Sequence, residues 1–199
     1  MIKRHLYAAA RLLLVAIALS LGAVSPALTE GKPALEISER DFSCIRDMTP
    51  VRGFFVDSLT GDLDATLAVA NSPNGGAYPP GSVVQLVPTE VMVKHPEGTS
   101  PATKDWEFFE LTVSPEGSKI AKRGFVDVNN RFGGNCLGCH AKAKPQWDMI
   151  CETGHGCDPI PLTKAMVRVI QKTDPRCESM PALSAEEKQL LGQLQQLLR

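Results

Sequence analysis

The residues best suited to chemistry lie together late in the chain, in the segment N-C-L-G-C-H at residues 135–140. Cys136 and Cys139 supply two thiols and His140 supplies an imidazole, all within five residues. Two thiols at this spacing can add to two vinyl groups on neighbouring edges of a porphyrin, and the adjacent histidine can then bind the iron. The spacing predicts one covalently bound haem c, with Cys136 and Cys139 as attachment residues and His140 as the proximal iron ligand.

Three other interpretations of the same residues stay open. A redox-active C-x-x-C of the thioredoxin type normally opens a helix inside a β-α-β unit, whereas this motif follows predicted antiparallel strands. Structural zinc needs a second pair of ligands, and the later segment C-E-T-G-H-G-C could supply Cys151, His155 or Cys157. A simple disulfide between Cys136 and Cys139 is the third alternative. The histidine that completes the attachment signature favours haem.

The N-terminus predicts export. Lys3 and Arg4 are followed, after Arg11, by the uncharged apolar run 12–24 and then by small residues. This order is that of a secretory signal peptide, and the run is shorter than the ~20 apolar residues of a membrane span. We therefore expect a signal peptide over residues 1–27 and a mature protein in the periplasm or outside the cell. An uncleaved membrane anchor is the alternative.

The expected mature chain, residues 28–199, carries too little positive charge to suggest a nucleic-acid partner. The full chain has 21 basic and 22 acidic residues, and three of the basic ones lie in the predicted signal, so the remainder has a net charge of −4. Its length suits one domain with a substantial core. The partners that we expect are a small gaseous or nitrogen-oxide ligand and a redox partner protein. The oligomeric state stays open, with a homodimer as one option.

All six cysteines lie outside the predicted signal, and an even number in an exported chain indicates disulfides. With the two motif cysteines committed to haem, four remain, and three pairings are open to them. The first choice joins Cys151 to Cys157 and closes a glycine-rich loop. It also joins Cys44 to Cys177, which ties the N-terminal lead-in to the C-terminal region.

Hydrophobic periodicity predicts a single α+β domain in which antiparallel strands precede the motif. The segment W-E-F-F-E-L-T-V at 106–113 predicts a strand whose side chains alternate between two faces, a turn follows, and a second strand completes a hairpin. A capping box of Ser184 and Glu187 begins a leucine-rich C-terminal helix. The expected elements are strands at 51–57, 81–88, 90–96, 106–113 and 119–128, and helices at 62–70, 163–173 and 185–198.

Several of these features resemble the P-460 cytochromes and their relatives, the cytochromes c′-beta. They are the Y-P-P-G-S-V-V turn and strand at 78–84, the D-W-E-F-F-E-L strand at 105–111, and the late attachment motif. The resemblance covers roughly residues 62–147 and implies a curved antiparallel sheet with flanking helices and a haem lying against the sheet. In the P-460 branch a lysine in the strand after the proline-glycine turn is bonded to the porphyrin, and the enzyme oxidises hydroxylamine. Here that strand reads S-V-V-Q-L-V, and Lys94 is the next lysine available.

The resemblance also implies a distal side that is open to a small ligand, and the candidate residues for it are Val84, Gln85, Leu86, Phe108 and Phe109. Because these residues are mainly apolar, we expect nitric oxide or carbon monoxide binding, or electron transfer, without turnover. A haem oxidoreductase of the P-460 type, acting on hydroxylamine or a related small nitrogen species, is the alternative. Strand side chains alternate, so either Val84 and Leu86 or Gln85 would face the iron. Gln85 could donate a hydrogen bond to a bound ligand.

Overall fold

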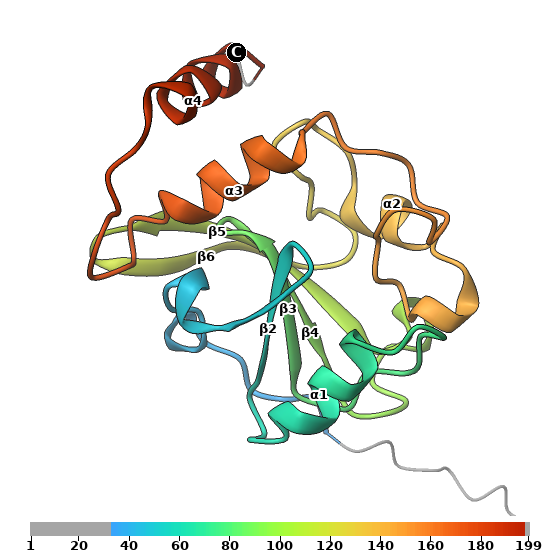
Figure 1. The fold of residues 1–199 in the computed structure, drawn as a ribbon. Helices are drawn as coiled ribbons and strands as arrows, with labels where there is room; N and C mark the ends of the chain where they lie inside the picture. The colour runs from blue at the N-terminus through green and yellow to red at the C-terminus, as the bar shows by residue number, and fades with distance from the viewer. Residues whose placement is uncertain (1–32, 198–199) are drawn as a thin grey trace, which may run out of the picture. The chain divides into compact units, whose positions relative to one another are not determined.

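A computed structural model describes residues 33–197 of the chain, so the predicted signal peptide, residues 1–27, lies outside the described residues. The described chain is α+β, with one antiparallel sheet of six strands and four α-helices (Figure 1). All of it belongs to one compact unit. None of the helices within residues 33–197 combines the length and the apolar character that crossing a membrane requires.

The strands follow the order of the chain across the sheet, and each pairs antiparallel with the next. The strands are β1 Thr49–Val51, β2 Phe54–Ser58, β3 Ser82–Val87, β4 Glu90–Lys94, β5 Trp106–Ser114 and β6 Gly117–Gly124. The α-helices are α1 Leu63–Ala70, α2 Cys136–His140, α3 Lys164–Lys172 and α4 Ala185–Leu197. Short 3-10 turns occur at Glu39–Asp41, Ile45–Asp47, Pro101–Thr103 and Pro145–Trp147. The predicted elements are present with shifts at their ends, except that a turn at Arg52 and Gly53 divides the strand expected at 51–57 between β1 and β2.

The largest shift is at β6, which was expected to reach Val128 but stops at Gly124. Gly124 has a φ of 104°, in the left-handed region that favours glycine, and the chain leaves the sheet there. The side-chain amide of Asn135 then donates hydrogen bonds to the carbonyls of Val126 and Val128, at 2.9 and 3.2 Å. The end of the predicted strand therefore anchors the start of the motif helix instead of extending the sheet.

Both faces of the sheet are covered. On one face Val84, Met92 and Phe108 form a row across β3, β4 and β5, and residues of α1 and α2 pack against this cluster. We call this the motif face. On the other, the lead-in face, Ile37 and Phe42 from the segment before β1 pack against a separate apolar cluster. The C-L-G-C-H motif thus belongs to one defined face of the sheet.

The C-terminal helix α4 begins at the predicted capping box. The Glu187 N–H donates to Ser184 Oγ at 3.2 Å, and the Ser184 N–H donates to Glu187 Oε2 at 2.8 Å. Lys172 of α3 forms an ion pair with Glu187 at 2.8 Å, and Leu194 of α4 is buried. The described helix ends at Leu197, and position 198 lies outside the described residues. α4 contacts α3, but within the described residues Leu194 is the one leucine of the predicted stripe that is buried, and Leu197 is 50% exposed.

Two disulfides join the four cysteines outside the motif, in the predicted pairing. Cys44 and Cys177 are separated by 133 positions in the sequence, and Cys151 and Cys157 by 6. Their Cα–Cα distances of 4.8 and 5.6 Å lie in the normal range for disulfides. The first links the segment before β1 to the segment after α3, and the second closes a small loop directly after the motif region.

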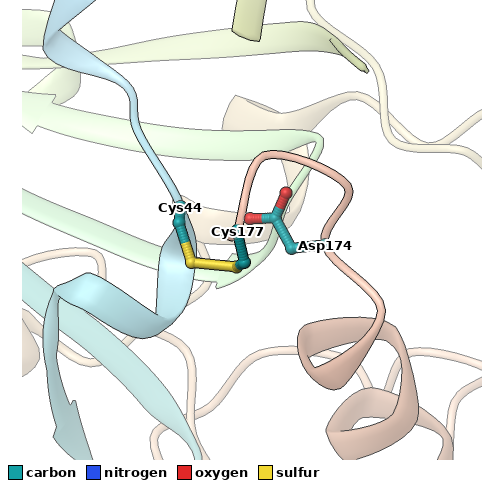
Figure 2. A group of neighbouring side chains, drawn as sticks. All are labelled: Cys44, Asp174 and Cys177. Atoms are coloured by element: carbon teal, nitrogen blue, oxygen red, sulfur yellow. A yellow bond between two sulfur atoms is a disulfide. The ribbon is translucent and has the colours of Figure 1, made fainter. Parts of the chain in front are cut away.

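A buried carboxylate lies beside the long-range disulfide (Figure 2). Asp174 is fully buried and accepts hydrogen bonds from the Ile45 N–H at 2.8 Å and from the Arg176 guanidinium at 2.7 and 2.9 Å. The Asp174 carboxylate and the sulfurs of Cys44 and Cys177 lie within 4.8 Å of one another. The sulfurs are bonded to each other and the carboxylate is paired with Arg176, so this cluster is a structural clamp.

Replacing Asp174 by alanine is expected to lower the free energy of unfolding by about 3–5 kcal/mol, because Arg176 keeps a buried charge without its partner. Urea denaturation of the oxidised protein measures the change. Asp158→Ala is the control: Asp158 forms an exposed ion pair with Lys142, and exposed pairs contribute little. Equal losses in the two variants would contradict a special role for Asp174.

The contribution of Asp174 is also expected to depend on pH. Burial raises the pKa of this carboxyl, but hydrogen bonds from Arg176 and from the Ile45 N–H outweigh burial and hold the pKa below its ordinary value. Because the folded-state pKa is lowered, the stabilisation is fully present above the unfolded-state pKa of about 4 and is lost as the pH falls through the folded-state pKa. The stability difference between wild type and Asp174→Ala should therefore shrink in acid.

Candidate functional site

The motif C-L-G-C-H forms the short helix α2, which a side-chain cap begins. Asn135 Oδ1 accepts a hydrogen bond from the Gly138 N–H at 2.9 Å, the usual role of an asparagine N-cap. The Cys136 N–H donates to the Val128 carbonyl at 3.0 Å. Together with the amide contacts of Asn135, these bonds tie α2 to the segment that follows β6. The motif is therefore held against the end of the sheet.

Neither motif thiol is bonded to another cysteine. All six cysteines of the chain lie within the described residues, and the other four form two disulfides with one another. Cys136 and Cys139 are both half-buried and do not form a disulfide with each other. Cys151 and Cys157, which were considered as a second pair of zinc ligands, form a disulfide with each other. Their sulfurs are therefore not thiolates that could bind zinc. Among residues 33–197, no group of three metal-binding side chains includes the motif. The arrangement therefore favours neither zinc nor a motif disulfide.

The electrostatics of Cys136 differ from those of a redox-active thiol. Burial raises the pKa of Cys136 to about 12, and the neighbouring groups Glu90, Cys139 and Glu110 add to the effect. Reactive C-x-x-C thiols have lowered pKa values, because the thiolate is their nucleophile. A thiol held in its neutral form at pH 7 does not match a thioredoxin-type centre.

His140 is held in one orientation by a backbone hydrogen bond. Its Nδ1 lies 2.7 Å from the Met149 carbonyl oxygen, and its ring packs edge-on against Phe108 with 5.3 Å between ring centroids. A carbonyl oxygen only accepts, so Nδ1 carries the proton and Nε2 keeps its lone pair. Burial lowers the pKa of His140, which favours the neutral imidazole. A neutral imidazole with Nδ1–H bonded to a carbonyl is the form in which histidine ligates metals.

The Met149 carbonyl belongs to a run of three carbonyls, at residues 148–150, that each accept a hydrogen bond from an aromatic ring nitrogen. The Asp148 carbonyl accepts from Trp106 Nε1 at 2.8 Å, and the Ile150 carbonyl lies 2.8 Å from His155 Nδ1. His155 also stacks on the neighbouring Trp147 ring at 3.8 Å. Sequence reasoning missed this segment, because backbone acceptors have no residue-type signature.

The structure separates the five residues that were expected to line the distal side. Val84 and Phe108 lie on the motif face, where Phe108 contacts His140. Leu86 is 37% exposed. Gln85 and Phe109 point to the lead-in face, where Phe109 joins the second apolar cluster and Gln85 Nε2 donates to the Pro88 carbonyl at 2.9 Å. Strand alternation thus removes Gln85 as a hydrogen-bond donor on the side of His140.

A cavity of about 270 Å³ lies where β5 begins and β6 ends. The lining residues are Ala34, His95, Thr99, Ser100, Trp106, Glu107, Arg123, Gly124 and Phe125. None of the five predicted distal residues lines it. The distal set expected from the sequence is therefore divided between the faces and does not form this cavity.

Lys94, the residue considered for a third covalent link, lies in a buried ion pair. Its ammonium group is 2.8 and 3.0 Å from the two carboxylate oxygens of Asp148 and donates to the Lys104 carbonyl at 2.6 Å. Its three hydrogens thus have three acceptors. Sequence reasoning identified Lys94 but not its partner.

Comparisons of the chain with protein-family models, with curated proteins and with solved structures gave no match.

Proposed function

We propose that this chain is an exported mono-haem c-type cytochrome. Cys136 and Cys139 would hold the haem through thioether bonds, and His140 Nε2 would bind its iron. The observation that carries the proposal is the hydrogen bond from His140 Nδ1–H to the Met149 carbonyl, in a helix that also presents two unpaired thiols. The donor set of two thiols and one neutral imidazole fits haem c.

The chain's own groups would prepare the site. The Asn135 cap holds α2 in place, and the apolar motif face borders the motif helix. Phe108 limits rotation of the His140 ring from one side. When bound, haem supplies an iron centre that can exchange an electron or take up a small ligand.

Ligand binding or electron transfer is proposed in preference to hydroxylamine oxidation. Two features support this choice. The amine of Lys94 is committed to Asp148 and to the Lys104 carbonyl, so it is not free to attack a porphyrin. Gln85, the amide considered as a ligand-contacting donor, faces away from His140. The same features make the resemblance closer to the c′-beta branch than to the P-460 branch.

Export to the periplasm or the extracellular space is part of the proposal. Two disulfides support it, since disulfides persist in oxidising compartments. Haem c attachment in bacteria also takes place outside the cytoplasm, which suits an N-terminal signal over residues 1–27. Identification of the N-terminal residue of the exported protein would test the expected cleavage after Ala27.

Covalent haem attachment is the first expected result. The protein, produced with a c-type maturation system, should stain for haem on a denaturing gel and keep its colour through acid-acetone extraction. The variant Cys136→Ser/Cys139→Ser should lose all attached haem. Cys151→Ser/Cys157→Ser is the matched control, because it also removes two cysteines close to the motif, and it should keep the haem.

Two outcomes would overturn the haem proposal. One is colour that acid-acetone extracts from the wild type. The other is a haem-free protein that holds zinc in a one-to-one ratio, lost in Cys136→Ser/Cys139→Ser. Ferrous spectra with and without carbon monoxide or nitric oxide then distinguish the functions. Hydroxylamine oxidation, with Lys94 found cross-linked by peptide mapping, would favour the P-460 alternative.

A further inference from the structure

The Lys94–Asp148 pair joins two parts of the chain that both have unusual backbone conformations. Lys104 and Asp105 have φ values of 49° and 65°, and Asp148 and Met149 have 46° and 67°. Left-handed conformations are unfavourable for non-glycine residues, and they persist only where surrounding contacts impose them. The Lys94 ammonium contacts both pairs, through the Lys104 carbonyl and the Asp148 carboxylate.

The surroundings of the pair leave the Asp148 side chain and backbone little freedom. The side chains of Lys94 and Asp148 are only 9% and 6% exposed. The Asp148 carboxylate also accepts a hydrogen bond from the Tyr78 N–H at 2.8 Å, and the Asp148 carbonyl accepts from Trp106 Nε1. The next carbonyl along the chain is that of Met149, which accepts from His140.

We propose that Lys94 and Asp148 are positioning residues for His140, acting through the Met149 carbonyl. The ion pair keeps Asp148 and Met149 in their left-handed conformations, and these conformations direct the Met149 carbonyl at His140 Nδ1. The carbonyl sets the tautomer and the basicity of the imidazole. The importance of the pair for iron ligation rests on the proposed function, whereas its effect on the His140 tautomer does not.

A purely structural role for the pair makes a different prediction. A buried ion pair adds little net stability, and replacing both partners by neutral groups is often neutral or stabilising. The variant Lys94→Met/Asp148→Asn leaves no unpaired charge, and asparagine tolerates left-handed φ values. If the pair were only structural, this variant would keep His140 unchanged. If the pair positions the Met149 carbonyl, His140 changes even though the fold is kept.

The first measurement is the His140 tautomer, from nitrogen NMR of full-length protein labelled at histidine. If haem is attached, the ferrous carbon monoxide form is used and only the exchange of the Nδ1 proton is read, because iron bound at Nε2 fixes the tautomer. In the haem-free chain both the tautomer and the exchange are read. We expect wild type to show one Nδ1–H tautomer protected from exchange. Lys94→Met/Asp148→Asn should lose this protection and exchange at least tenfold faster. Unchanged tautomer and exchange in a folded double variant would overturn the proposal.

The second measurement is the reduction potential of the haem-loaded protein. Weakening the Nδ1–H bond makes the imidazole a poorer donor to ferric iron, so the reduced form should be favoured about tenfold, or about 59 mV for one electron. Glu107→Gln is the matched control, since Glu107 accepts from His95 and Arg123 on the lead-in face. It should leave the potential unchanged, and an equal shift in the control would contradict specific positioning.

The two proposals fail separately. A wild type without attached haem, in which the double variant still alters the His140 tautomer, would reject the haem proposal and retain the positioning one. Attached haem with the same reduction potential and the same Nδ1–H exchange in wild type and double variant would retain the haem proposal and reject the positioning one. Lys94→Gln/Asp148→Asn, which also leaves no unpaired charge, provides a second variant if Lys94→Met/Asp148→Asn does not fold. It keeps an acceptor for the Tyr78 N–H, and its His140 exchange should also rise.

Discussion

Replacing His140 by alanine is expected to leave the haem covalently attached and to change the ligation of its iron completely. The thioether bonds to Cys136 and Cys139 do not depend on the imidazole, so staining on a denaturing gel should persist. The side-chain space beside Phe108 and the Met149 carbonyl would be vacated. Added imidazole should enter that space and restore a spectrum close to that of the wild type.

The chain supplies a close control for this experiment. His155 also bonds through Nδ1 to a backbone carbonyl, that of Ile150, only one residue beyond the acceptor of His140. It is buried and stacks on Trp147. His155→Ala should therefore cost stability but leave the ferric and ferrous spectra unchanged. An unchanged spectrum in His140→Ala, or an equal change in His155→Ala, would show that His140 is not the ligand.

Removal of the long-range disulfide is expected to cause the largest loss of stability. For a closed loop of 133 positions, chain entropy predicts a loss of about 5 kcal/mol in Cys44→Ser/Cys177→Ser. For the loop of 6 positions, Cys151→Ser/Cys157→Ser should lose only about 2 kcal/mol. Urea denaturation of both double variants and of wild type, all under oxidising conditions, measures the difference.

The comparison also tests the origin of the effect. If the disulfides stabilise the protein mainly by constraining the unfolded chain, reduction of the wild type should lower its free energy of unfolding by the sum of the losses in the two double variants. If local packing around Asp174 dominates, Cys44→Ser/Cys177→Ser should lose little, because serine is close in size to cysteine and the ion pair with Arg176 remains. Equal losses in the two double variants would contradict the dependence on loop length.

The chemistry of the motif could be predicted from the sequence because it is local. Cys136, Cys139 and His140 lie within one short helix, so their spacing along the chain already defines their spacing in space. The same reasoning explains the correct helix start at Ser184, since a capping box involves residues three apart. The pattern over 106–113 likewise predicted β5, because successive side chains of a strand point to opposite faces of its sheet.

Other features stayed open, or were predicted wrongly, where a residue's surroundings come from distant parts of the chain. The alternation of β3 allowed Gln85 to face either way, and strand pairing together with the lead-in segment determined that it faces away from His140. The predicted strand beyond Gly124 was replaced by a loop, because the amide of Asn135 binds the carbonyls there. Nothing in the strand's own residues indicates that competing hydrogen bond.

The support of His140 was decided by the tertiary structure alone. The hydrogen bond from His140 is accepted by a backbone carbonyl, which every residue possesses, so the residue type at position 149 does not indicate this role. The conformation that aims this carbonyl is left-handed at two non-glycine residues, which local propensity disfavours. Lys94 and Asp148, 54 positions apart, impose it through a buried ion pair. The sequence by itself determined that two thiols and an imidazole lie together in one short helix, and the long-range contacts determined how that imidazole is held.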